Sequence, residues 1–330
     1  MTSIHRSQST SAWEKTGTRR RVDGGSTQLG QPPGFPRPIP RPGFAGQRYA
    51  LARGEELNVR LADGYELVVA DLGGDGLPLI VLHGGPGLDH TGFRPWLDPL
   101  GEDFRVIYVD ERGQGRSESV DPATLSLEVF ARDVDLLAEA LGLDRFAVLG
   151  HSFGAIITTE HAIEAGTAEG YVLSGGADSS EELMADVGAS LEAMGEAGKP
   201  IAESWEWEQS VETQEECAEL MRVQAPFHFH GAPPPDFAAD TVYAPEVLRH
   251  FSNEGYGNFD YTPRLERVAK PALVIVGAHD RVTTPRAARV LHDGIPGSEL
   301  VILEEAGHMA MIEAQDAYLG AVRKFLGALG

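Results

Sequence analysis

Cysteine is nearly absent from this chain, since only Cys217 occurs among 330 residues. A single cysteine forms no intrachain disulfide, which excludes the small folds that depend on disulfide bonds. A chain of this length buries a sizeable core without them. Nothing around Cys217 resembles a cysteine-nucleophile motif, so we expect it to be a bystander. The cysteine count favours a cytoplasmic protein.

Long apolar runs are missing too: no run reaches the roughly 18 residues that a membrane helix needs. No hydrophobic stretch follows the arginines at 19–21, so we expect neither a secretory nor a twin-arginine signal. Basic residues are few, with 27 Lys and Arg against 50 Asp and Glu and a net charge of −23. Nucleic acids and anionic membranes would repel such a chain, so we expect neither as a partner.

Residues 1–45 are rich in Ser, Thr, Gly, Pro and Arg. The prolines oppose helix and sheet, and the segment has little apolar surface to bury. We therefore predict a disordered or extended arm over 1–45. It holds seven basic and two acidic residues, so it could lie against an acidic body.

Buried strands and helices alternate from about residue 46 to 177 and again over 263–330. Continuous apolar runs such as LPLIVL and FRVIYV are typical of strands buried on both faces. The alternation predicts an α/β fold with a mostly parallel, doubly wound sheet. The alternation of strands and helices stops over residues 178–262, which predict a mainly helical cap with 18 acidic and three basic residues. We expect this cap over the carboxyl edge of the sheet, where such folds bind ligands.

The sequence GHSFG at 150–154 follows an apolar strand and opens a helical pattern. In that context the G-x-S-x-G pattern places a serine on a strained strand-to-helix turn, with its hydroxyl exposed. Ser152 is therefore the predicted nucleophile. The loop HGGPG at 83–87 directly follows another buried strand. We expect the N–H groups of Gly85 and Phe153 to form the oxyanion hole.

A general base and an orienting acid are expected after the last two strands. His308 lies in EEAGHMAM, and Asp280 follows LVIV in GAHDRVTTP. The imidazole would take the serine proton, and the carboxylate would fix the histidine tautomer. We expect the side chain of His151 to point elsewhere, whereas His228 and His230 could line a pocket.

The loop DERGQGRS at 110–117 predicts a tight turn near the same edge of the sheet, with Asp110 and Arg112 as structural partners. The pattern FHFH lacks a third metal ligand at suitable spacing. We expect no metal and no cofactor.

With HGGPG, DERGQGRS, GHSFG, GAHDRVTTP, GSEL and GHM in this order, the chain resembles the proline iminopeptidase branch of the α/β-hydrolases, including tricorn-interacting-factor-like aminopeptidases. The resemblance covers roughly 55–177 and 263–330. It implies the α/β-hydrolase fold, a Ser-His-Asp triad and an acyl-enzyme. The chain departs from the branch at Glu111, where glutamine is frequent. It departs again at GHSFG, which replaces a GGSWG-like sequence and is common among esterases.

Aminopeptidases of this branch hold the substrate ammonium with cap glutamates, often near a Trp-x-x-Trp-Glu pattern. The similar but shorter SWEWEQS supplies Trp205, Glu206, Trp207 and Glu208, and Glu254 is a weaker candidate. Carboxylates facing a pocket would attract a cation, and aromatic faces would support it. The alternative is a solvated acidic helix face with the tryptophans packed on the core.

Three functions remain open. The first is an aminopeptidase or amidase that acts on a small substrate or short peptide with a free amine, such as an N-terminal proline. The second is an esterase or lactonase acting on a small ester or metabolite. The third is a non-catalytic binding protein with the same fold. Epoxide hydrolases and dehalogenases need aspartate where Ser152 stands. The sequence does not indicate an oligomeric state.

Overall fold

The computed structural model describes residues 55–329. The predicted arm over 1–45 lies outside the described residues. Within the described range, no helix combines the length and the apolarity that crossing a bilayer requires. The predicted α/β class is confirmed.

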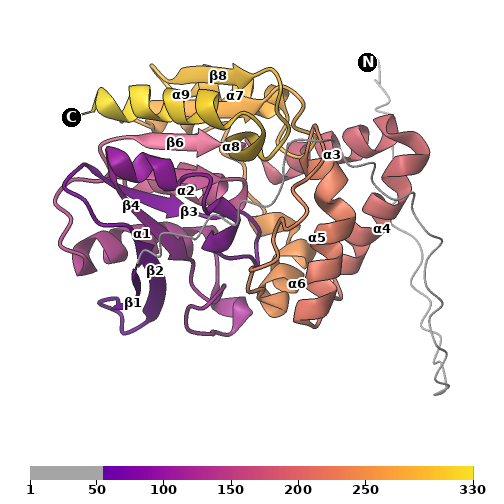
Figure 1. Ribbon diagram of the computed structural model, residues 1–330, viewed down its shortest axis with the longest axis horizontal. Helices are drawn as coiled ribbons and strands as arrows, with labels where there is room; N and C mark the ends of the chain where they lie inside the picture. The colour runs from indigo at the N-terminus through magenta and orange to yellow at the C-terminus, as the bar shows by residue number, and fades with distance from the viewer. Residues whose placement is uncertain (1–54, 330) are drawn as a thin grey trace, which may run out of the picture. The chain divides into compact units, whose positions relative to one another are not determined.

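Between residues 55 and 329 the strands form one eight-stranded sheet in the order β1-β2-β4-β3-β5-β6-β7-β8 (Figure 1). Strand β2 runs antiparallel to both of its neighbours, and the six strands that follow β2 in this order are parallel to one another. The strands are β1 (Glu55–Arg60), β2 (Glu66–Asp71), β3 (Pro78–Leu82), β4 (Arg105–Asp110), β5 (Ala147–His151), β6 (Tyr171–Ser174), β7 (Ala272–Gly277) and β8 (Glu299–Leu303).

The central strands are buried on both faces, as their continuous apolar sequences predict. In β3 the side chains of Ile80 and Leu82 join one apolar cluster, while Leu79 and Val81 join the cluster on the other face. This alternation follows from the two-residue period of a strand. The sheet is therefore the middle layer between two cores.

Helices cover both faces of the sheet. Buried side chains of α1 (Leu127–Ala140), α2 (Phe153–Glu164) and α7 (Pro285–Gly294) belong to the first cluster, and those of α8 (Ala310–Glu313) and α9 (Gln315–Gly327) belong to the second. Short 3-10 turns connect the elements: η1 (His90–Phe93), η2 (Asp98–Glu102), η3 (Pro122–Thr124), η4 (Gly195–Gly198), η5 (Gly255–Gly257) and η6 (Leu265–Arg267).

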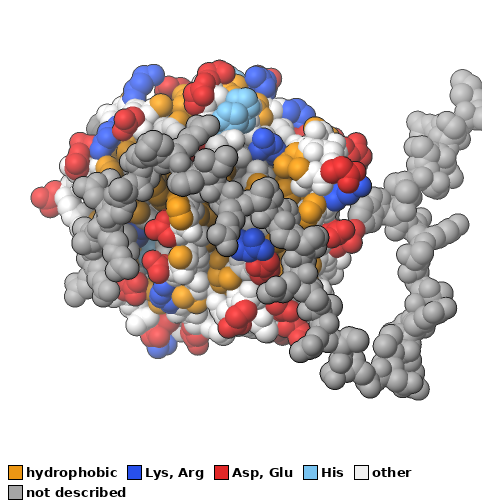
Figure 2. Space-filling view, turned by 45° about the vertical axis from the view of Figure 1, so that its right-hand side comes forward, with side chains coloured by type: hydrophobic (Ala, Val, Ile, Leu, Met, Phe, Trp, Pro, Cys, Tyr) orange, Lys and Arg blue, Asp and Glu red, His pale blue; other side chains and the backbone are white. Residues whose placement is uncertain are grey.

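The insertion between β6 and β7 is helical. It contains α3 (Ser180–Ala193), α4 (Lys199–Glu208), α5 (Gln214–His228) and α6 (Pro245–Asn253), which lie beyond the end toward which β6 and β8 point (Figure 1). Ser179 and Asp260 pair as an antiparallel bridge, so the two ends of the insertion meet. We call residues 178–262 the cap. Figure 2 shows acidic side chains spread over the visible described surface among basic and apolar ones.

Candidate active site

Ser152 lies on a strained turn between β5 and α2, with φ 56° and ψ −119°. Glycines on both sides make this turn possible. A Cβ atom on Gly150 would lie 2.1 Å from the Gly154 carbonyl oxygen, and one on Gly154 would lie 2.3 Å from that of Leu82. Real Cβ atoms do not approach backbone so closely, so the G-x-S-x-G spacing is a steric requirement here. The Ser152 hydroxyl forms no cap bond with α2.

Asp280 and His308 form a buried pair. His308 Nδ1 lies 2.8 Å from Asp280 Oδ2, and each residue is 4% exposed. The backbone N–H groups of Val282 and Thr283 donate to Asp280 Oδ1, both at 2.9 Å, and the Thr283 hydroxyl donates to Oδ2 at 2.9 Å. These donors fix the carboxylate, which in turn orients the imidazole.

The HGGPG loop, which we call the oxyanion loop (residues 83–87), packs directly against Ser152. A Cβ atom on Gly84 would lie 3.2 Å from Ser152 Cβ. Phe153 is the first residue of α2, so its N–H has no partner in the helix. Among the hydrogen bonds found within residues 55–329, none occupies the N–H of Gly85 or Phe153. Within this range both predicted oxyanion donors are therefore free.

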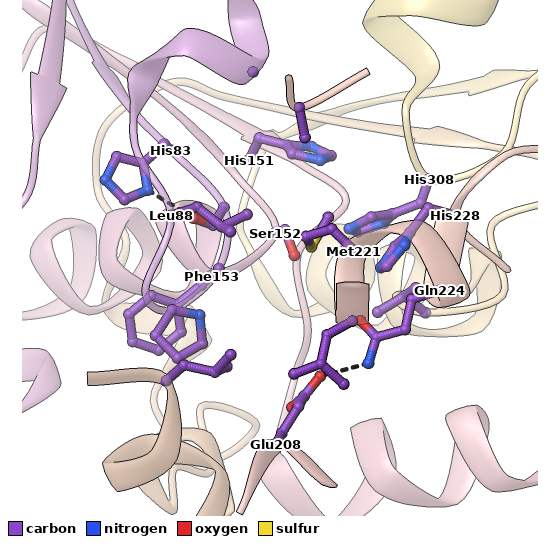
Figure 3. A pocket seen from close by; sticks show the side chains of 18 of the residues that line it. His83, Leu88, His151, Ser152, Phe153, Glu208, Met221, Gln224, His228 and His308 are labelled. Carbon is purple, nitrogen blue, oxygen red and sulfur yellow. Dashed lines mark hydrogen bonds between the residues drawn. The ribbon is translucent and has the colours of Figure 1, made fainter. Parts of the chain in front are cut away.

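Four histidines line the cavity, and three of their rings, those of His151, His228 and His308, lie together beside Ser152 (Figure 3). His151, expected to point elsewhere, has its ring centroid 4.6 Å from that of His308, and the His228 centroid lies 5.5 Å from the same ring. Burial, together with the nearby His308, lowers the pKa of His151 well below its usual value and that of His228 to about 3. These two rings are held neutral. His230 instead stacks on His279.

The cavity over Ser152 has a volume of about 140 Å³. That is room for on the order of ten water molecules, which suits a small substrate. Most of its walls are apolar and come from both the core and the cap; they include Phe93, Ile156, Leu183, Leu220, Met221 and Leu248. Such a lining binds through burial of apolar surface, and a few polar groups fix the orientation of the ligand.

Two of the predicted cap residues, Trp205 and Glu208, line the cavity. Glu208 is 5% exposed and accepts hydrogen bonds from Gln224 Nε2 at 2.6 Å and from the Tyr256 hydroxyl at 2.5 Å. Burial raises the pKa of the Glu208 carboxyl, and these hydrogen bonds oppose the shift. Figure 3 shows the Glu208–Gln224 bond across the cavity from the oxyanion loop residue His83.

The other predicted cap residues do not reach the cavity. Glu206 and Glu254 are exposed. Trp207 is absent from the cavity lining and packs against a cap cluster that includes Val211 and Leu220, of which Leu220 also lines the cavity. Gln224 and Tyr256 could not be identified from the sequence, because neither belongs to a recognisable motif.

The DERGQGRS loop carries the expected structural contacts. Asp110 accepts from the Arg116 N–H at 2.8 Å and lies 2.6 Å from His90 Nδ1. Arg112 binds Asp133 and Asp63 through its guanidinium group. In the described part of the chain, no group of three or more His, Cys, Asp or Glu is arranged to hold a metal ion.

Comparisons with known proteins agree with this architecture. Residues 79–321 match the family model described as the alpha/beta hydrolase family. A proline iminopeptidase of Clostridium botulinum (strain Hall) is 30% identical over 283 residues, which cover 79% of this chain and 94% of that protein. The crystal structure of a proline iminopeptidase-related protein from Thermus thermophilus is similar, with a TM-score of 0.66 and 30% identity over 84% of this chain and 98% of that one. An esterase from Exiguobacterium antarcticum shares the fold, with a TM-score of 0.63 and 19% identity over 82% and 98% of the two chains. The chain therefore belongs to the alpha/beta hydrolase family and is a proline iminopeptidase-like hydrolase.

Proposed function

We propose that this hydrolase is a serine hydrolase whose triad is Ser152, His308 and Asp280. Ser152 Oγ attacks the substrate carbonyl carbon while His308 Nε2 takes the hydroxyl proton. The resulting oxyanion accepts hydrogen bonds from the N–H groups of Gly85 and Phe153. His308 then gives its proton to the leaving group, and water releases the acyl group by the same steps.

The observation that carries this proposal is the buried pair of His308 and Asp280, 2.8 Å apart. The imidazole of this pair lines the same cavity as Ser152 on its strained turn. Such backbone strain costs free energy, on the order of 1–3 kcal/mol, and it persists where function requires it. A binding protein would need neither the strained serine nor the oriented imidazole.

We propose further that the substrate carries a free amine, which would favour an aminopeptidase or amidase. Two carboxylates line the cavity. Asp89 is already paired with Arg116, whose Nη1 lies 2.6 Å from Asp89 Oδ2. Glu208 has only neutral hydrogen-bond donors around it among the described residues. A substrate ammonium would supply the missing opposite charge in a place where water is largely excluded. The face of Trp205 would support the same cation.

An esterase or lactonase is the second candidate. The mostly apolar walls of the cavity and the raised pKa of Glu208 favour it. A neutral Glu208 would not attract an ammonium group, and an ester of moderate size would bind through its apolar parts.

Hydrolysis of prolyl- and alanyl-p-nitroanilide beside p-nitrophenyl acetate and butyrate separates the two candidates. We expect turnover of the free-amine amides, loss of that turnover when the amine is acylated, and loss of all turnover in Ser152→Ala. Ester turnover alone, dependent on Ser152, would make the esterase the correct function. Turnover that survives in Ser152→Ala would refute the serine mechanism.

The amine site is tested by Glu208→Gln with Glu206→Gln as its matched control. Both residues belong to α4, but only Glu208 faces the cavity. For the amides we expect KM to rise at least about tenfold in Glu208→Gln, because a charge-assisted hydrogen bond is lost. Glu206→Gln should leave KM unchanged, and neither change should affect the esters. An unchanged KM in Glu208→Gln would show that Glu208 does not hold the amine.

A further inference from the structure

The DERGQGRS loop holds the oxyanion loop at both of its ends. Gln114 Oε1 accepts a hydrogen bond from the Gly87 N–H at 2.5 Å. At the other end, His83 Nδ1 lies 2.6 Å from the carbonyl oxygen of Gly84, and His83 Nε2 is in contact with the Glu111 carboxylate. Gly85, the first oxyanion donor of the proposed mechanism, lies between these two attachments.

Both ring nitrogens of His83 face acceptors. A neutral imidazole has one N–H, so it can donate to only one of them, whereas an imidazolium donates to both. The side chains of His83 and Glu111 are 2% and 4% exposed, which keeps the pair out of water. Burial alone would lower the pKa of His83, but the Glu111 carboxylate outweighs burial and raises that pKa to about 9. A second contact at Nε2, from the Glu111 N–H, is long at 3.4 Å.

The carbonyl group of Gly84 belongs to the same peptide unit as the N–H group of Gly85. We propose that the buried Glu111–His83 pair positions and polarises this peptide, so that the Gly85 N–H becomes a stronger donor to the oxyanion. Hydrogen bonds in a chain strengthen one another, and a cation at the carbonyl end makes the N–H end more positive. Glu111 and His83 are thus positioning residues that act through Gly85. This inference rests on the proposed serine mechanism.

The remaining ionisable groups around His83 do not replace Glu111. Asp110, the last residue of β4, lies beside Glu111 but is bonded to His90. His151 approaches from β5, because a Cβ atom on Gly84 would lie 3.6 Å from its Cδ2 atom, and burial keeps that ring neutral. The second Glu111 oxygen, Oε1, has no hydrogen-bond partner among the described residues. A buried acceptor without a partner is costly. Burial also raises the pKa of the Glu111 carboxyl, and the contact with His83 opposes that shift, so the charge on Glu111 depends on the imidazolium beside it.

The test is the pH dependence of kcat for p-nitrophenyl acetate between pH 6 and 10.5, with Ser152→Ala as the blank at each pH. In the wild-type protein we expect kcat to fall above about pH 9, as His83 loses its proton, while KM stays constant. Glu111→Gln keeps the size of the side chain but removes the charge that holds the proton. Its kcat should already be about three- to tenfold lower at pH 7, with no further fall near pH 9.

Asp135→Asn is the matched control, because Asp135 is the carboxylate of another buried histidine, with Oδ1 3.0 Å from His161 Nε2. His161 and Asp135 are absent from the cavity lining. This variant should leave the pH profile of kcat unchanged, even where it lowers stability. A profile that changes equally in Asp135→Asn and Glu111→Gln would assign the effect to stability and overturn the proposal.

Other outcomes separate this inference from the proposed function. Ser152-dependent turnover with a fall near pH 9 that persists in Glu111→Gln, or an effect on KM in place of kcat, would refute the role of His83 alone. Turnover that does not need Ser152 would refute both proposals. If Glu111→Gln does not fold, NMR of the wild-type protein with 15N-labelled histidine decides. Two protonated His83 nitrogens at pH 7.5, titrating near pH 9, would support the inference, and a neutral ring at pH 7.5 would refute it.

Discussion

The carboxylate of Glu313 accepts a 2.7 Å hydrogen bond from the backbone N–H of Gly307, the residue before His308. Its other oxygen accepts from the N–H of Gly231, just beyond α5 of the cap, also at 2.7 Å. The N–H of His308 itself donates to the carbonyl oxygen of His228 at 2.8 Å. The cap is therefore attached directly to the loop that carries the proposed general base.

Glu313→Ala should loosen this attachment. The change leaves the N–H groups of Gly307 and Gly231 without their partner, and we expect the free energy of unfolding to fall by about 1–2 kcal/mol. We also expect kcat to fall several-fold, because a freer loop holds His308 less well in its productive position. Urea unfolding and ester hydrolysis measure the two effects. Glu304→Ala is the control: Glu304 is exposed on the same loop, and its loss should stay within about 0.5 kcal/mol. Equal losses in the two variants would argue against the attachment.

Gly154→Ala should prevent the turn at Ser152 from forming. The added Cβ would lie 2.3 Å from the Leu82 carbonyl oxygen and 2.5 Å from that of His83. Both atoms belong to the backbone, so they cannot move aside as a flexible side chain would. We expect a loss of about 3 kcal/mol or more in the free energy of unfolding, together with loss of labelling by a fluorophosphonate probe.

Gly188→Ala is the matched control for that change. Gly188 lies within α3, and a Cβ atom there would meet no other atom within 4 Å. Alanine is preferred to glycine inside a helix, so this variant should gain about 0.5–1 kcal/mol. A Gly154→Ala protein as stable as the wild type would contradict the steric account of the turn.

Thr283→Val should weaken the orientation of the proposed acid. The Thr283 hydroxyl donates to Asp280 Oδ2, the oxygen that contacts His308, and the bond is buried. Valine has the same shape without the donor, so we expect kcat to fall by up to about tenfold with little change in KM. Thr262→Val removes an exposed hydroxyl that donates to Asp260 and should leave kcat unchanged. Full activity in Thr283→Val would mean that the two backbone donors hold Asp280 without help.

The parts of the fold that local sterics and apolar runs encode could be predicted from the sequence. The apolar run at 78–82 predicts a strand buried on both faces, and GHSFG predicts the turn at Ser152 because only glycine fits beside it. The contact between His83 and Glu111 could not be predicted in this way. It arises because β3 and β4 are neighbours in the sheet, and neither motif specifies that order.

The orientation of the cap was only partly accessible from the sequence. The buried positions of α4 are Ile201, Ser204 and Glu208, which follow the helical spacing of three to four residues. Once these residues are assigned to a helix, that spacing places Glu208 on the buried face and Glu206 on the face toward solvent. The hydrogen-bond partners of Glu208 could not be predicted from this spacing. Gln224 and Tyr256 reach it only through the packing of α4 with α5 and the chain after α6. Tertiary packing of this kind leaves no local pattern.

The buried carboxyl of Glu208 should make stability depend on pH in a defined direction. Burial raises its pKa above the ordinary value of 4.5, so the folded protein binds this proton more tightly than the unfolded chain. The contribution to stability is therefore fully present below the unfolded pKa and is lost as the pH rises through the folded pKa. Glu208→Gln removes the titration. Relative to the wild type, the variant should thus become more stable as the pH rises from 4.5 to 7.

Urea unfolding of both proteins at pH 4.5 and at pH 7 measures this difference. Glu206→Gln is again the control, because an exposed carboxyl on the same helix should change stability by the same small amount at both pH values. A difference between Glu208→Gln and wild type that does not change with pH would show that Glu208 is not perturbed by burial. In that case the esterase candidate would lose one of its two supports, since an ionised Glu208 at neutral pH is what an amine-binding cavity requires.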